Sequence, residues 1–260
     1  MPTSVWTGRI TFGLVSVPIR LYPTTKSHDI HFHLLHEKDM SRVGIQYYCK
    51  KDEEVVERSE LVKGYEYKKG EFIIVEPEEL EAIEPESSSN LDIQQFIDMA
   101  EVDPIYYENS YYAAADEGSE KTYALLLDAM RKKNRAAIGK LLMRDREYLT
   151  LIRPTDRGLV LETMYFEDEI RTAPQKAPKE QKARTKEKEL AELLVDNLTE
   201  PFDPEKFKDE YQERVEALIE AKVKGHKVKT FRKKPVKTVP NILEALEKSL
   251  KQAQKNKKTA

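Results

Sequence analysis

The chain has 260 residues, 35% of them charged and 39% hydrophobic, which is enough for one core and an extension beyond it. Its single cysteine, Cys49, excludes a disulfide framework and suits a reducing cytoplasm. No apolar run approaches the roughly 18 residues that a membrane-spanning helix needs. We also expect no signal peptide, because a strand pattern begins almost directly after Met1.

The net charge of −3 conceals a strong asymmetry along the chain. Residues 222–260 contain 13 Lys or Arg and 2 Asp or Glu, a net charge of +11. Residues 1–221 contain 31 basic and 45 acidic residues, a net charge of −14. This polarity predicts a basic tail that seeks a polyanion or an acidic partner, and the alternative is a solvated tail that only aids solubility.

The opening stretch alternates between apolar and polar residues, as a half-buried strand does. The apolar set changes parity at Gly13: Trp6, Gly8, Ile10, Phe12 and Leu14 precede the change, and Val15, Val17, Ile19 and Leu21 follow it. A bulge at Gly13 would keep both sets on the inner side. We therefore predict one curved strand from Trp6 to Tyr22, of the kind that forms a barrel wall.

Residues 29–36, directly after His28, alternate again and predict a second strand. Four of the five histidines lie here, and Cys49 follows them: His28, His31, His33 and His36. Histidine and cysteine are the usual zinc ligands, but their spacing matches no closed zinc pattern. We expect ordinary strand histidines and no metal ion or other cofactor.

A strand or hairpin punctuated by Gly64 and Gly70 interleaves lysines with aromatic residues, including Tyr65 and Tyr67. That mixture suits contact with a nucleic-acid backbone. The alternative is a barrel strand with core tyrosines and solvated lysines.

The segment from Glu76 to Glu120 has 14 acidic residues and no Lys or Arg. Such a surface has nothing to neutralise phosphate, so it should lie away from DNA or pair with a second subunit. We expect a short helix at residues 78–83 and a strand from Leu91 to Ile97 within it.

Residues 121–134 predict a helix, with Ser119 as its N-cap and an apolar stripe at helical spacing. Three strands should follow, at residues 137–143, 148–153 and 159–166, with a turn at 155–158. Residues 121–157 contain 10 basic and 4 acidic residues, so this part of the body is the most able to face DNA.

A Pro-, Lys- and Gln-rich linker at 173–188 precedes two predicted helices. The first contains Leu190 and Leu198, and the second begins at an N-cap formed by Asp203, with Pro204 in its first turn. A basic stretch then leads to a short amphipathic helix whose stripe is Ile242, Leu243, Leu246 and Leu250.

The residues together predict a mainly β protein with added α structure (α+β). Residues 1–172 should form a barrel-like body, 173–222 a linker and helical arm, and 223–260 a basic tail with the short helix. No nucleotide-binding or hydrolase motif is present, and we assign no catalytic residue.

Several motifs, in one order along the chain, resemble those of bacterial Ku, the DNA end-joining protein. They are the Trp6-to-Tyr22 stretch, VKGYEYKKGEF from Val62, VDPIYY from Val102, YALLLDAM from Tyr123 and FEDEIR ending at Arg171. The resemblance covers nearly the whole chain. Many Ku relatives have a Cys-x-x-Cys where this chain has only Cys49, which argues further against a metal.

The resemblance implies a Ku-like β-barrel with extended arms, and a homodimer that encircles a duplex end without reading bases. It also implies recruitment of an ATP-dependent DNA ligase, with no nucleotide, metal or membrane required, in the cytoplasm at the nucleoid. Carried over by position, the phosphate contacts are Arg20, Lys63, Lys68, Arg144 and Arg146. The ligase-recruiting element is the short helix of Ile242, Leu243, Leu246 and Leu250.

Two other functions remain open. One is a DNA lyase that forms a Schiff base at abasic sites through a lysine, although no particular lysine stands out. The other is a ligase-recruiting adaptor whose DNA binding is incidental.

Overall fold

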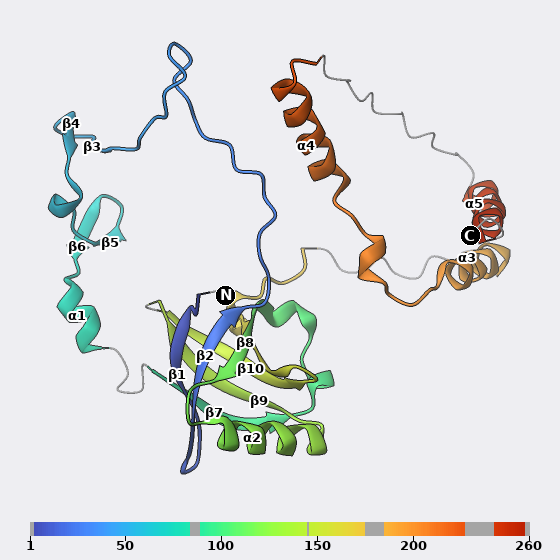
Figure 1. Ribbon diagram of the computed structural model, residues 1–260, viewed down its shortest axis with the longest axis horizontal. Coiled ribbons are helices and arrows are strands. Elements are labelled where there is room, and N and C mark those ends of the chain that lie inside the picture. Colours follow the sequence, from blue (N-terminus) through green and yellow to red (C-terminus); the bar gives the residue numbers. More distant parts are fainter. Residues whose placement is uncertain (1–2, 84–88, 145, 175–184, 227–241, 258–260) are drawn as a thin grey trace. The chain divides into compact units, whose positions relative to one another are not determined.

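The computed structural model describes residues 3–83, 89–144, 146–174, 185–226 and 242–257 (Figure 1). The chain forms two compact units, Met1–Thr172 and Ala173–Ala260. The strands of the first unit are β1 (Trp6–Phe12), β2 (Val15–Pro23), β3 (Tyr47–Cys49), β4 (Glu54–Val56), β5 (Gly64–Lys68), β6 (Glu71–Ile74), β7 (Asn90–Ile97), β8 (Tyr107–Ala115), β9 (Ala136–Met143), β10 (Arg146–Thr155) and β11 (Gly158–Met164). Its helices are α1 (Pro77–Ala82) and α2 (Glu120–Lys133); the second unit contains α3 (Thr185–Leu198), α4 (Glu210–Val223) and α5 (Ile242–Lys257).

Seven strands close into a barrel in the order β1-β2-β8-β11-β10-β9-β7. Neighbours are antiparallel except β1 and β7, which pair in parallel and complete the ring. The predicted barrel and the mixed α+β class are confirmed. The strands predicted after α2 are also confirmed, within a few residues at each end.

The prediction of one curved strand from Trp6 to Tyr22 is wrong. Gly13 has a φ of +59°, which lets the chain reverse, and Phe12 then pairs with Val15 across a hairpin. The change of parity at Gly13 therefore marks a two-residue turn and not a bulge. The strand members of both apolar sets still face inward, since Ile10 in β1 and Val17 in β2 are fully buried, whereas Leu14 lies in the turn and is exposed.

The barrel interior holds one buried apolar cluster. It includes Ile10, Ile19 and Leu161 from the strands, and Leu126 and Met130 from α2 join it. The apolar stripe of α2 therefore covers the barrel as its helical spacing predicts, and the helix lies against the strands in Figure 1. The predicted cap is only partly right: Ser119 is the N-cap residue, but its hydroxyl donates to the carbonyls of Pro18 and Asp116 and accepts no hydrogen bond from the first turn of the helix.

Between β2 and β7, the two neighbours of β1 in the barrel, the chain makes a long excursion, of which the structure describes residues 24–83 and 89. It contains two small hairpins, β3–β4 and β5–β6, and helix α1. The predicted strand at 29–36 is wrong: residues 25–46 form turns and irregular backbone, with one isolated bridge between Leu35 and Arg42. Alternation alone does not make a strand where no neighbouring strand supplies hydrogen bonds.

In the second unit, α5 packs along α3. Helix α4 begins later than predicted, because Asp203 caps only a short 3-10 turn at Pro204–Lys206. Asp209 caps α4 instead, accepting hydrogen bonds from the backbone N–H groups of Tyr211 and Gln212. The predicted linker at 173–188 and basic stretch before Ile242 fall largely outside the described residues.

Candidate nucleic-acid interface

The outer side of one barrel wall gathers arginines around an exposed tyrosine. Along β2, β8 and β10, Arg20, Tyr112 and Arg153 alternate with residues of the interior cluster, so they point outward. The strand registers place these positions on one wall: Arg20 lies opposite Ala114, two residues along β8 from Tyr112, and Val160 lies between Tyr112 and Arg153. We name Arg20, Tyr112, Arg153 and Arg157, which lies in the turn after β10, the arginine face.

Two of these arginines already have carboxylate partners. Arg20 lies 2.8 Å from an oxygen of Asp116, and Nε of Arg153 lies 2.8 Å from Oε1 of Glu162. Glu162 is 6% exposed, so its charge depends on Arg153 and on the hydroxyl of Ser110, which also donates to it. Among the described residues, no ion pair holds Arg157. Its guanidinium is therefore the cation of this face most available to a ligand.

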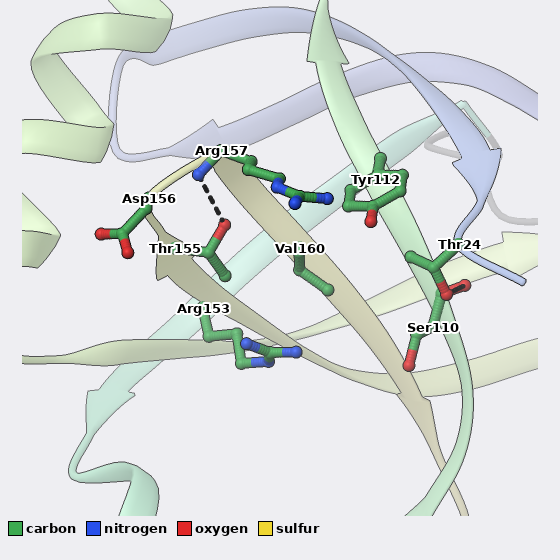
Figure 2. A pocket seen from close by; sticks show the side chains of 8 residues that line it. All are labelled: Thr24, Ser110, Tyr112, Arg153, Thr155, Asp156, Arg157 and Val160. Atoms are coloured by element: carbon green, nitrogen blue, oxygen red, sulfur yellow. Dashed lines mark hydrogen bonds between the residues drawn. The ribbon is translucent and has the colours of Figure 1, made fainter. Parts of the chain in front are cut away.

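A hollow of about 330 Å³ lies within this face, and Figure 2 shows the side chains that line it. Val160 lies in its middle, the guanidinium of Arg157 points toward Tyr112, and Arg153 lies on the other side of Val160. Thr24 and Ser110 close the hollow at the edge farthest from the turn. A second hollow of about 480 Å³ shares Tyr112 and Arg157 and is otherwise lined by Ala113, Ala114, Ala115, Tyr123 and Leu159. The small alanines leave room for a ligand backbone to come close to the sheet.

Arg144 and Arg146 lie together at the turn from β9 to β10, at the opposite end of β10 from Arg157. Arg146 forms an ion pair with Glu169, and its guanidinium lies 4.9 Å from the centre of the Tyr148 ring. Arg144 has a φ of +55° and an exposed side chain. Burial raises the pKa of Tyr111, and the positive charge of Arg144 partly offsets that rise.

Lys63 and Lys68 belong to the β5–β6 hairpin of the excursion, where every residue of both strands is exposed. The ammonium of Lys68 lies 5.6 Å from the Tyr67 ring centre and 3.9 Å from Glu71. Tyr65 and Tyr67 are 67% and 48% exposed. The alternative in which these tyrosines are barrel core is therefore wrong, and the hairpin exposes both its lysines and its tyrosines to solvent.

The five predicted contacts thus fall on three surfaces: Arg20 on the arginine face, Arg144 and Arg146 at one turn, and Lys63 and Lys68 on the hairpin. The sequence reasoning missed Arg153 and Arg157. Both belong to the basic segment 121–157, and alternation from Ile152 would have placed Arg153 outward. The pairing of β8 with β2 and β11, which brings Arg20 to the same face, has no signal in the sequence.

The predicted ligase-recruiting stripe faces its own chain. Leu250 is 6% exposed, Leu243 and Leu246 are half-buried, and α5 packs on α3. An ion pair of 3.9 Å between Lys186 and Glu247 accompanies the helix pair. The side chain of Ile242 lies outside the described residues.

Within the described residues, no three His, Cys, Asp or Glu side chains gather closely enough to hold a metal ion. No described helix combines the length and apolar character needed to cross a membrane.

Comparison with known proteins gives the class. A family model described as the Ku70/Ku80 beta-barrel domain matches residues 11–192. Similar curated proteins include one from Solibacter usitatus, 45% identical over 258 residues, covering 99% of this chain and 97% of the relative. A relative from Koribacter versatilis is 44% identical, and the match covers 99% of this chain and 89% of the relative. A relative from Archaeoglobus fulgidus is 39% identical, and the match covers 95% of this chain and 98% of the relative.

The chain therefore belongs to the Ku family. The three relatives share the name "Non-homologous end joining protein Ku", which connects this family to DNA repair by end joining. The resemblance found in the motifs is confirmed.

Proposed function

We propose that this chain is a homodimeric, sequence-independent binder of double-stranded DNA ends in non-homologous end joining. The observation that carries the proposal is the similarity over nearly the full length to proteins named for that process. The described surfaces support it, because their cations lie on outward strand faces and exposed turns, where they can contact phosphate. Phosphate contacts position a protein on a duplex without reading sequence. In the cell, the protein would act at chromosomal DNA in the cytoplasm.

A competition assay tests end binding. A labelled linear duplex is bound, and unlabelled linear fragments or closed circles of the same sequence are added as competitors. We expect linear fragments to compete and relaxed circles to compete poorly, because the protein must thread onto an end. Equal competition per base pair would reject end binding.

The excursion supports a dimer. Its exposed apolar side chains are too numerous for a surface that stays in water: Phe32, Leu34, Ile45, Phe72, Ile73 and Ile74 are 74%, 79%, 98%, 63%, 52% and 54% exposed. Two-stranded hairpins such as β3–β4 and β5–β6 are also marginal alone. A second copy paired about a two-fold axis is the commonest way to cover such a segment. Light scattering should give a dimer at micromolar concentration, and a monomer that still binds ends would contradict the proposal.

We also propose that the C-terminal segment recruits an ATP-dependent DNA ligase. In the free chain the α5 stripe is covered by α3, so the ligase would contact the α3–α5 pair or displace α3. Deletion of residues 239–260 should abolish ligase stimulation and only slightly weaken end binding. Deletion of residues 258–260 is the matched control and should change neither. Full stimulation by the longer deletion would reject this role.

The binder is proposed to be non-enzymatic. A Schiff-base lyase needs a lysine that is desolvated or held beside another cation. Among the lysines from Lys26 to Lys251 whose side chains the structure describes, none is buried: Lys140 is half-buried and lies 2.8 Å from Glu147, and the others are exposed. Borohydride trapping on abasic DNA should give no covalent complex; a trapped complex would reinstate the lyase.

A further inference from the structure

The hollow of the arginine face has the features of an anion site. Two guanidinium groups flank it, and Arg153 uses Nε for Glu162. A guanidinium has five N–H donors, so both terminal amino groups of Arg153 remain for a ligand. Arg157 brings a second guanidinium from the opposite side of Val160 (Figure 2). Planar guanidinium groups match the oxygens of a phosphate in two-point hydrogen bonds.

The hydroxyl groups at the rim already have acceptors. Thr24 donates to the Ser110 carbonyl at 3.1 Å, Ser110 donates to Glu162, and Thr155 donates to the Gly158 carbonyl at 2.8 Å. Donors for a ligand therefore come from the two arginines and from the Tyr112 hydroxyl. This donor set favours an anion over a neutral sugar or an amine.

Two carboxylates oppose an anion here. The Glu162 carboxylate already forms an ion pair with Arg153 and accepts a hydrogen bond from Ser110. Asp156 also lines the hollow, but Figure 2 shows its carboxylate directed away from both guanidinium groups. The side facing the ligand is thus positive although the four charges sum to zero.

The size and lining match one nucleotide unit. A volume of about 330 Å³ lies at the small end of ligand sites, which begin at about 300 Å³. Val160 offers an apolar floor for a deoxyribose, and Tyr112, 38% exposed, offers a ring on which a base can stack. A phosphate between Arg153 and Arg157 would complete the contacts.

We propose that this hollow binds a phosphate group of the DNA, with Arg157 as its principal cation. The inference rests on the proposed function and assigns two residues, Arg153 and Arg157, to it. The phosphate could be the 5′-terminal group of an end or one within the backbone. These share one chemistry, and the experiment separates them.

The test variant is Arg157→Gln in the full chain. Arg157 lies in an exposed turn without an ion pair among the described residues, and the hydrogen bond from its backbone N–H to Thr155 survives the change. Arg153→Gln is unsuitable, because it would leave Glu162 buried without its cation. The matched control is Arg171→Gln, which removes the same charge from an exposed position beyond the opposite end of β11.

Fluorescence anisotropy would measure binding of 5′-phosphorylated and 5′-hydroxyl linear duplexes over a series of salt concentrations. For Arg157→Gln we expect roughly tenfold weaker binding, and a salt slope reduced by about 1 for each site that the duplex engages. Loss only on the phosphorylated duplex identifies the terminal phosphate, and equal loss on both identifies a backbone phosphate. Arg171→Gln should keep the wild-type slope.

Affinity and slope equal to those of Arg171→Gln on both duplexes would overturn the site while leaving end binding intact. If the wild-type chain itself binds neither duplex, the proposed function fails and the site fails with it. Thermal unfolding of both variants should match the wild type, and an unfolded Arg157→Gln protein would overturn the view that this side chain serves only the ligand.

Discussion

Replacement of Tyr123 by phenylalanine tests the link between α2 and the strands beneath the arginine face. The Tyr123 hydroxyl donates to the carbonyl of Ala113 on β8 and accepts from the N–H of Leu159 on β11, both at 2.7 Å. Ala113 and Leu159 are opposite each other in the ladder and are 3% and 1% exposed. One hydroxyl therefore satisfies two buried backbone groups. Burial also raises the pKa of Tyr123, so this hydroxyl keeps its proton at neutral pH.

The change leaves both backbone groups without this partner. Each unsatisfied buried group costs about 1–3 kcal/mol, but water in the adjoining hollow can replace part of the loss. We therefore expect the free energy of unfolding to fall by about 2 kcal/mol. With a denaturant dependence of about 2 kcal/mol per molar urea, the midpoint should fall by about 1 M.

Urea unfolding followed by the fluorescence of Trp6 gives a direct assay, because this is the only tryptophan and it packs against the barrel core. Tyr112→Phe is the matched control: its hydroxyl makes no hydrogen bond to a described residue, so the midpoint should stay within about 0.2 M of the wild type. Equal urea midpoints for the two variants would show that the hydrogen bonds of the Tyr123 hydroxyl do not stabilise the barrel.

Three further predictions concern the barrel and its ligand. Thr150 is fully buried and its hydroxyl has no hydrogen-bond partner in the described structure, so Thr150→Val should stabilise the protein by about 1 kcal/mol in thermal unfolding. The control Thr163→Val removes the acceptor of the Asn109 N–H, so it should destabilise the protein in the same experiment. A Cβ at Gly139 would lie 2.6 Å from the Asp92 carbonyl oxygen, so Gly139→Ala should lower the free energy of unfolding by about 1–3 kcal/mol. Gly44 has no described atom within 4 Å of the position that a Cβ would occupy, so Gly44→Ala should leave stability unchanged. Equal stabilities of the two variants would contradict the close approach of β7 to Gly139. If a duplex contacts about 6–10 phosphates, affinity should fall roughly 10³–10⁵-fold between about 50 and 200 mM salt, and anisotropy showing a salt-independent affinity would exclude phosphate-driven binding.

Local patterns predicted the barrel's later half well. The periodic stripe of α2, the alternation of β9 to β11 and the turn at 155–158 depend on contacts between neighbours in sequence, and the structure has them all. The hairpin at Gly13 was misread because a bulge and a tight turn change parity in the same way. The two differ in whether the backbone reverses direction at Gly13, and composition does not encode that reversal.

Partnership between distant segments could not be predicted. The strand predicted at 29–36 has the right alternation but lacks a neighbouring strand to pair with. Arg20 was identified, yet its place on the same barrel wall as Arg153 and Arg157 follows from the pairing of β8 with both β2 and β11. The apolar stripe of α5 was identified from its spacing, whereas its contact with α3 depends on the fold of the second unit.

The central claim, that the protein threads onto DNA ends, is tested most directly by trapping. The protein is bound to a linear duplex at low salt, the ends are then joined into a closed circle, and the complex is challenged with high salt. If the protein encircles the duplex, it should stay on the closed circle and be released when a nuclease linearises the DNA. Release from closed circles and linear molecules at the same rate would contradict threading.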